Sequence, residues 1–188
     1  MKNNISLVFT IFMGLLIGHS QEATDNSSEL TFGVKAGFSS TVLRINVENI
    51  TVSEDVSGFY VGVFGDLSIS EAIGIHSELL YGSYSQDGES TDILFLPILA
   101  QFNVNDRFHL MAGPQFDYLL DADASEGLKR LGIGIGLGAA FDITEQLILD
   151  ARYSFGLNNR LEGDIEELNG TNVQAKFNYL LIGLGYRF

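Results

Sequence analysis

The sequence contains no cysteine, and it has only two prolines in 188 residues. The absence of cysteine excludes disulfide bonds, a lipid-anchored cysteine and any cysteine-ligated metal site. Basic residues are also scarce, with 10 Lys and Arg against 24 Asp and Glu. Such an acidic chain disfavours nucleic acid and anionic lipid as partners. After residue 20 no apolar run is long enough to form a transmembrane helix, so only a closed barrel could place this chain in a membrane.

Apolar residues are abundant and follow a regular pattern. They make up 46% of the chain, with 14 Phe and 7 Tyr, which excludes a disordered protein. In 180–188 every second residue is apolar, and the residues between them are Leu181, Gly183, Gly185 and Arg187. This period of two predicts a β-strand with an apolar medium on one side. That medium is either a protein core or membrane lipid.

The first 20 residues have the features of a secretory signal peptide. Lys2 precedes an apolar run over 5–17, and Gly18-His19-Ser20 offers small residues at the cleavage positions. We expect cleavage before Gln21, a short periplasmic tail over 21–29 and a barrel domain over 30–188. The alternative is an uncleaved membrane anchor, but a run of about 13 apolar residues falls short of the roughly 20 that span a bilayer.

Eight segments show the strand period, and each is about ten residues or a little longer, as a tilted membrane strand requires. They lie near 32–39, 59–67, 73–82, 93–102, 108–118, 131–138, 147–155 and 172–188. Short polar turns at 68–72, 103–107 and 142–146 alternate with longer connections at 40–57, 85–92, 121–129 and 158–171. This alternation is typical of outer-membrane barrels, whose long loops lie outside the cell.

The predicted fold is therefore all-β, an eight-stranded antiparallel up-and-down transmembrane β-barrel in the cell outer membrane. Ten strands remain an alternative, if the first or last long connection contains a further hairpin. Pro97 and Pro114 fall within predicted strands, where each removes a ladder hydrogen bond. With a turn centred on Asn105, both lie at one height of one hairpin, and we expect a local β-bulge to accommodate them.

Several motifs resemble a known family. The stretch 93–99 followed by 108–116, which contains Gly113-Pro114-Gln115, resembles the "PLL" and "GPQ" hairpin of PorT-like outer-membrane β-barrel proteins, which are common in Bacteroidota. The glycine repeat of 134–138, the segment 151–157, Glu78 to Tyr81 and the terminal Gly185-Tyr186-Arg187-Phe188 are similar to the same family. The resemblance covers 30–188. It implies an outer-membrane barrel, and some members are associated with protein secretion, but it implies no single activity.

Polar residues of the predicted strands share the face opposite the apolar one. An eight-stranded barrel is just wide enough for side chains to fill it, so we expect these residues to form a paired network inside. The predicted lumenal residues are Lys35, Asp66, His76, Glu78, Gln115, Asp117, Asp150, Arg152 and Arg187. Arg152 is expected at the centre, with the glycines of 132–138 making room for long side chains.

Two groups of residues could carry chemistry, and for both the simpler interpretation is favoured. His76 and Glu78 share a face and could act as a base with its orienting carboxylate, but parity alone is weak evidence for catalysis. The acidic stretches 121–126 and 162–167 could hold Ca²⁺, but they lack the spacing of a calcium loop and are better explained as solvated loops. We expect no enzyme activity, no metal and no cofactor.

The leading hypothesis is an integral outer-membrane barrel, expected to be a monomer, that acts in surface interaction or envelope structure. Its expected partners are outer-membrane lipid, the barrel-assembly machinery reading Tyr186 and Phe188, and an unidentified extracellular or periplasmic partner. The alternative is a PorT-like accessory component of protein secretion or transport. A third possibility is an exported soluble barrel that binds an apolar ligand, but this requires apolar residues inside and polar ones outside.

Overall fold

The computed structural model describes residues 29–47, 50–86, 89–120, 127–161, 167–168 and 171–188. The predicted signal peptide, most of the periplasmic tail and most of the acidic stretches 121–126 and 162–167 lie outside these residues. All described elements are strands. No helix among them is long and apolar enough to cross a membrane.

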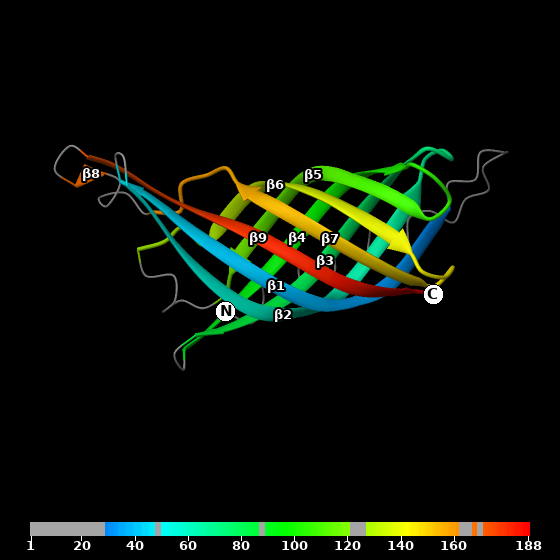
Figure 1. Cartoon of the computed structure of the whole chain (residues 1–188), viewed down its shortest axis with the longest axis horizontal. Coiled ribbons are helices and arrows are strands. Elements are labelled where there is room, and N and C mark those ends of the chain that lie inside the picture. The colour runs from blue at the N-terminus through cyan, green and yellow to red at the C-terminus, as the bar shows by residue number, and fades with distance from the viewer. Residues whose placement is uncertain (1–28, 48–49, 87–88, 121–126, 162–166, 169–170) are drawn as a thin grey trace, which may run out of the picture.

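The strands form one closed antiparallel barrel (Figure 1). Each wall strand pairs with its sequence neighbour, and β9 pairs with both β7 and β1, which closes the sheet. The strands are β1 (Leu30–Val47), β2 (Ile50–Ser68), β3 (Ile73–Gln86), β4 (Glu89–Asn103), β5 (Phe108–Leu119), β6 (Leu131–Asp142), β7 (Leu147–Gly156), β8 (Glu167–Leu168) and β9 (Thr171–Arg187). The predicted eight-stranded barrel is confirmed, because β8 pairs only with the outer end of β9 and is not part of the wall.

Two of the expected long connections are mostly strand. The antiparallel pairing of β1 with β2 continues to Val47 and Ile50, well inside the segment 40–57 that the sequence assigned to a loop. Likewise β3 and β4 pair as far as Gln86 and Glu89. The physical reason is composition, since 41–56 is rich in Thr, Val and Ile, and β-branched residues favour strand even among polar neighbours.

Beyond the outer rim of the wall, three strands continue together as a sheet that we call the outer extension. The pairing of β2 with β3 begins only at Gly58, and that of β9 with β7 begins only at Tyr179. The outer extension therefore comprises 41–47 of β1, 50–57 of β2 and 173–178 of β9 (Figure 1, left end).

The expected β-bulge at the prolines is wrong. Pro97 pairs with Gln115, and the next pair in the same hairpin is Ala100 with Ala112, in unchanged register. The two prolines do lie at one height, as predicted, and they interrupt the ladder there without adding a residue to either strand. Pro114 keeps its place opposite Ile135 of β6.

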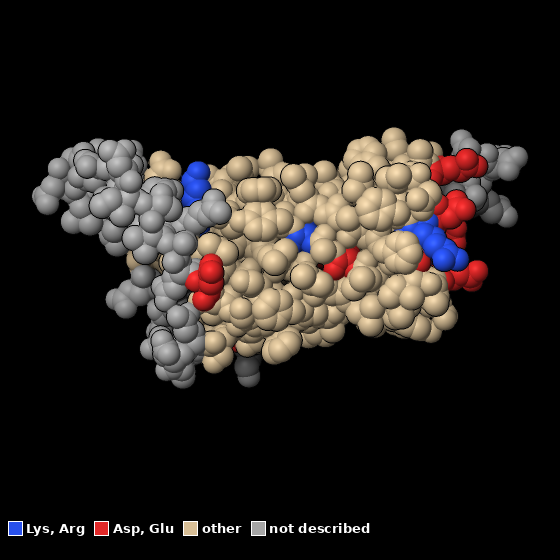
Figure 2. Space-filling view, viewed as in Figure 1, with Lys and Arg blue, Asp and Glu red and all other residues tan. Residues whose placement is uncertain are grey.

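The outer face of the wall is apolar, and the side-chain alternation agrees with the predicted faces. Large apolar side chains that face outward include Val34, Phe38, Val63, Ile75, Leu110, Ile133, Ile135, Leu149, Ile182 and Leu184. Figure 2 shows a broad, mostly uncharged band with small areas of blue and red near its middle, and larger charged areas toward the ends of the molecule. Such a band suits contact with the hydrocarbon core of a membrane.

Candidate functional site

The candidate site is the interior of the barrel, where buried charges from several strands meet. Glu78 of β3 is fully buried and contacts three other groups at once. Its Oε2 accepts a hydrogen bond of 2.7 Å from Arg152 Nη2, and its Oε1 contacts both Lys35 Nζ and His76 Nε2. Lys35 also pairs with Asp150, with Nζ 2.6 Å from Oδ2. We call Lys35, Asp66, His76, Glu78, Asp150 and Arg152 the central cluster.

The central cluster ties opposite walls of the barrel together. Along the closed strand order, β3 and β7 are four positions apart in an eight-stranded wall, so the Arg152–Glu78 pair crosses the lumen. Lys35 of β1 lies between them on one side and contacts both Glu78 and Asp150. Ion pairs that cross the lumen fix the shape of the barrel cross-section.

His76 links the central cluster to the periplasmic end. Its Nδ1 lies 2.5 Å from Asp66 Oδ1, while its Nε2 lies 2.7 Å from Glu78 Oε1. An ionised carboxylate only accepts hydrogen bonds, so two ionised partners require both ring nitrogens to donate, as the imidazolium does. In that form His76 donates one hydrogen bond to each carboxylate and has no free ring nitrogen. This arrangement suits a structural pairing role rather than that of a general base.

A second group of charges lies at the short-turn end, which is periplasmic in an outer-membrane barrel. Arg187 approaches Asp66 at 3.6 Å and Asp142 at 3.4 Å, and Asp142 also contacts His109 at 3.3 Å. A cavity of about 10 Å³ between this group and the central cluster has room for about one water molecule. Within the described part of the chain, the cavity-lining oxygens Asp66 Oδ2 and Asp142 Oδ1 have no hydrogen-bond donor, so a water there would satisfy them.

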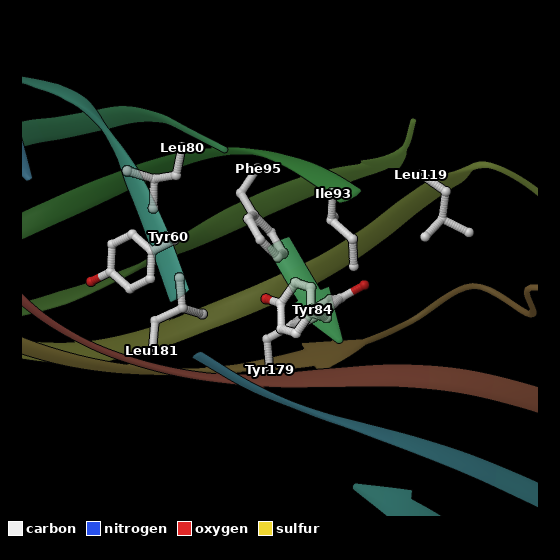
Figure 3. Packing of buried hydrophobic residues seen from close by; sticks show 8 residues of the cluster. All are labelled: Tyr60, Leu80, Tyr84, Ile93, Phe95, Leu119, Tyr179 and Leu181. Atoms are coloured by element: carbon white, nitrogen blue, oxygen red, sulfur yellow. The ribbon is translucent and has the colours of Figure 1, made fainter. Parts of the chain in front are cut away.

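Above the central cluster the lumen is filled by apolar and aromatic side chains. Figure 3 shows these residues pointing into the same space from different strands: Tyr60, Leu80, Tyr84, Ile93, Phe95, Leu119, Tyr179 and Leu181. Phe95 and Tyr179 meet edge to face, with ring centroids 4.9 Å apart. Two polar pairs lie in the same region, Tyr84 donating to Ser39 at 2.7 Å and Ser154 donating to Gln115 at 2.6 Å. Each of the eight side chains of this layer is at most 3% exposed, so the layer is closely packed.

Arg160 closes the outer mouth, a role the sequence did not reveal. It follows β7 in the chain, yet its side chain is almost fully buried and donates to Asp117 Oδ2 at 2.5 Å. Its other guanidinium nitrogens donate to the carbonyl oxygens of Lys129 and Arg130, and the group lies over the ring of Phe177. Asp117 also accepts from the Tyr179 hydroxyl at 3.0 Å. We call the Arg160–Asp117 pair the outer latch.

Glycines make room for these long side chains. A Cβ at Gly132 would lie 2.0 Å from Arg160 Nη1, and one at Gly136 would lie 3.1 Å from Arg152 Cδ. On β9 a Cβ at Gly183 would lie 1.9 Å from the Tyr60 hydroxyl oxygen. The predicted role of the β6 glycines therefore extends to β9.

The Gly183 contact gives a direct test of lumen packing. We expect Gly183→Ala to destabilise the barrel by about 1–3 kcal/mol through overpacking, and Tyr60→Phe to restore most of this loss, because it removes the clashing oxygen. The measurement is denaturant unfolding of the refolded barrel in detergent. Gly113→Ala is the matched control, since its Cβ would lie 2.3 Å from the backbone oxygen of Ile98 and its nearest neighbours include no atom of Tyr60. Equal rescue of both variants would contradict this packing.

The structure brings the nine predicted lumenal residues to the inner face in three separate groups. Lys35, Asp66, His76, Glu78, Asp150 and Arg152 form the central cluster, Arg187 lies at the periplasmic end, and Gln115 and Asp117 lie toward the outer mouth. Sequence reasoning missed Arg160, Asp142 and the Tyr60–Tyr84 layer. The inward parity of Tyr60 was visible in the sequence, whereas Arg160 lies outside any alternating segment.

The remaining predicted residues lie where their sequence positions imply. Tyr186 and Phe188 are exposed on the outer face at the end of β9, with ring centroids 5.9 Å apart. Among the described residues, no group of three or more His, Asp and Glu side chains has a geometry that could hold a metal ion.

Comparison with known proteins agrees with this architecture. Residues 19–162 match the family described as outer membrane protein beta-barrel domain. A search of curated protein sequences found no match. Among solved structures, the attachment invasion locus protein Ail of Yersinia pestis is 16% identical, with 85% of this chain and 99% of that chain covered and a TM-score of 0.47.

Two further solved structures are similar at the same level. Neisserial surface protein A is 12% identical over 85% of this chain and 99% of its own, with a TM-score of 0.48. OprG of Pseudomonas aeruginosa is 12% identical over 87% of this chain and 98% of its own, with a TM-score of 0.46. The family match covers most of the chain, and it agrees with the closed barrel and its apolar outer band. The chain belongs to the outer membrane protein beta-barrel domain family and lies in the outer membrane.

Proposed function

We propose that this protein is a sealed outer-membrane barrel that holds its outer extension at the cell surface for interaction with a partner, without catalysis and without transport through its own lumen. The observation that carries the proposal is the filled interior. Four obstructions follow one another along the axis: the Arg187 group, the central cluster, the aromatic layer and the outer latch. A pore would need a continuous open path along the barrel axis, and the side chains of these four groups fill the space that such a path would require.

The ionic groups suit a structural role better than a chemical one. Each carboxylate of the central cluster faces a cation or a histidine nitrogen, so none is free to activate a substrate. Buried ion pairs contribute more to a unique geometry than to net stability, as an interior that keeps a surface platform rigid requires. The outer extension then provides the surface that varies with function, as loops on a rigid scaffold do.

Two measurements test this proposal. In planar bilayers, the refolded full-length mature chain should give no steady conductance, and a stable open channel would contradict a sealed lumen. In cells, replacing 41–56 by an Asn-Gly turn should leave the folded barrel in the membrane while abolishing its partner interaction. The matched control shortens the β3–β4 tip instead and should keep the interaction. Unchanged interaction after loss of the outer extension would contradict its proposed role.

The outer latch gives a second test of the sealed interior. We expect Arg160→Met to destabilise the barrel by about 3–5 kcal/mol at most, because it leaves Asp117 buried with the Tyr179 hydroxyl as its remaining donor. Conductance should stay absent, since the aromatic layer still fills the lumen. The checks are denaturant unfolding in detergent and bilayer recording. Arg107→Met in an exposed periplasmic turn is the control and should be close to neutral.

The terminal strand fits assembly by the general outer-membrane route. Tyr186 and Phe188 form an exposed aromatic pair at the end of the closing strand. We propose that the barrel-assembly machinery reads this pair, as the sequence suggested, and that the folded protein is a monomer.

An accessory role in protein secretion is the second candidate. It is favoured by the resemblance of the Pro97–Gln115 hairpin to PorT-like proteins. This role predicts a periplasmic or membrane partner rather than an extracellular one. Deleting the gene should then change the profile of secreted proteins, whereas an unchanged profile would exclude the role.

A further inference from the structure

The outer extension has two long edges, and one of them is covered. The edge of β9 carries β8, which pairs at Asn172 and Thr171. Further down the same edge, the Ala175 carbonyl accepts from the Arg160 amide at 2.9 Å, and the Ala175 amide donates to Asn159 Oδ1 at 2.9 Å. The chain after β7 therefore folds back and satisfies the backbone groups of this edge.

The other edge is the outer part of β2, residues 50–57. Its pairing with β3 ends at Gly58 opposite Tyr84, while its pairing with β1 continues to Ile50. Among the described residues no backbone segment pairs with this edge. Unpaired N–H and C=O groups in a row form a template for an added strand, and natural proteins avoid long stretches of this kind unless they are used.

The register identifies which backbone groups face the open edge. The Ser68 amide donates to the Glu29 carbonyl of the β1 side at 2.9 Å, and the register is unbroken from there to Ile50. In an antiparallel pair the amides of one strand point alternately toward and away from its partner. The even-numbered residues of β2 therefore bond to β1, and the amides of Thr51, Ser53, Asp55 and Ser57 point to the open edge.

The charge on and beside this edge is mainly negative. No Lys or Arg occurs between Arg44 and Arg107. The edge strand itself carries Glu54 and Asp55, and Glu89 and Asp92 lie at the outer end of β4. Of the basic residues at the outer end of the molecule, Arg44 of β1 pairs with Ser53 of the edge strand, whereas Lys129, Arg130 and Lys176 belong to the β6 and β9 side. The edge strand and the adjacent end of β4 carry four carboxylates against this one guanidinium, so the open edge favours a cationic partner over an anionic one.

We propose that residues 50–57 of β2 bind an extended, basic segment of a partner protein by β-strand addition at the cell surface. Main-chain hydrogen bonds from Thr51, Ser53, Asp55 and Ser57 supply the affinity, and the negative charge of the edge strand selects lysine or arginine. A second copy of this chain fits less well, because each copy has a net charge of −14. This inference rests on the proposed display of the outer extension at the surface.

Amide hydrogen exchange on the full mature chain, refolded in lipid nanodiscs, tests the proposal residue by residue. In the free protein, the amides of Thr51, Ser53 and Asp55 should exchange much faster than those of Val52 and Glu54. Adding a synthetic extended peptide of alternating Val and Lys, matched in length to the edge, should slow the fast set by at least about tenfold. Fast amides that do not respond to the peptide would overturn the proposal.

Variants separate the contributions of backbone and charge. Ser53→Pro removes one edge-facing donor without touching the β1 ladder, and it should weaken peptide binding while Val52 and Glu54 stay protected. The charge reversal of Glu54→Lys with Asp55→Lys should weaken binding of the Lys peptide at least about tenfold and favour a Glu peptide instead. Glu145→Lys, the same charge change in a periplasmic turn, is the control and should have no effect. Binding that ignores both edge variants would overturn the proposal.

Other outcomes are informative as well. Protection of the edge amides in the free protein that rises with protein concentration would mean that a second copy occupies the edge, and would overturn a basic partner. Protection that is independent of concentration would mean that the chain covers its own edge, and this too would overturn the proposal. Failure of surface display is separate: an outer extension inaccessible to labelling on intact cells removes the proposed function, whatever the peptide titration gives.

Discussion

Glu78→Gln is expected to be the most damaging change inside the barrel, with a loss of about 3–5 kcal/mol in the free energy of unfolding. Glu78 is fully buried and faces Lys35, His76 and Arg152 together. The amide keeps the size of the side chain but removes the charge, which leaves two buried cations to share Asp150. The measurement is urea unfolding of the refolded protein in detergent, followed by the mobility shift of the folded band on heating.

A double-mutant cycle isolates the pair that crosses the lumen. Arg152→Met alone should also be costly, because it leaves Glu78 with excess negative charge at the centre. The double variant should cost less than the sum of the two, with an interaction energy of roughly 1–3 kcal/mol. Glu145→Gln, in an exposed turn, is the control for charge removal. Additive effects would mean that the two side chains do not pair across the lumen.

The faces of the strands were predictable from the sequence because the side-chain period of a strand is fixed at two. Once Ile133 and Ile135 were assigned to lipid, the glycines of β6 had to face the lumen, and the same argument placed Lys35, His76 and Arg152 inside. The tight turns then determined which strands are neighbours. Fold and inner face therefore follow from local rules that operate within one strand or one hairpin.

The partners across the lumen could not be predicted in the same way. Whether Arg152 meets Glu78 or Asp150 depends on the stagger of strands around the closed barrel, which no single hairpin determines. In the structure Arg152 reaches Glu78 across the lumen, while Asp150 pairs with Lys35. Arg160 was invisible for a different reason, since it reaches the interior from a connection that folds back over the mouth.

The extent of the outer strands and the prolines show where local rules fail. In residues 41–56 the polar residues occur at irregular spacing. Strands were predicted where apolar and polar residues alternate, so this stretch was predicted to be a loop. The pairing of β1 with β2 continues through this stretch although its sequence lacks that alternation. The missing bulge has a similar cause, because hydrogen bonds lost at Pro97 and Pro114 are tolerated when the ladders on either side hold the register.

Ile135→Arg is expected to have the largest effect on the outer face. Ile135 lies in the middle of β6 and is 44% exposed, with Pro114 and Phe155 as its cross-strand neighbours. An arginine here would face hydrocarbon without a partner, which costs about 2–4 kcal/mol near the midplane of the membrane. Refolding into lipid vesicles, measured by the heat-shifted band, should slow or fail. Glu145→Arg in the exposed periplasmic turn should refold as the wild type does.

A lipid-contact reporter makes this prediction independent of folding yield. The chain contains no tryptophan, so a single Ile135→Trp variant provides the only indole signal. Brominated lipid chains should quench this fluorescence strongly, whereas Tyr60→Trp, at a buried lumenal position, should be protected. Normal refolding of Ile135→Arg together with quenching at position 60 would contradict the assigned faces. It would mean that the side chains described as lumenal face lipid, and that those described as lipid-facing lie inside. A reversed wall would place the charges of the central cluster in lipid without partners, and the Arg152–Glu78 and Lys35–Asp150 pairs could not form.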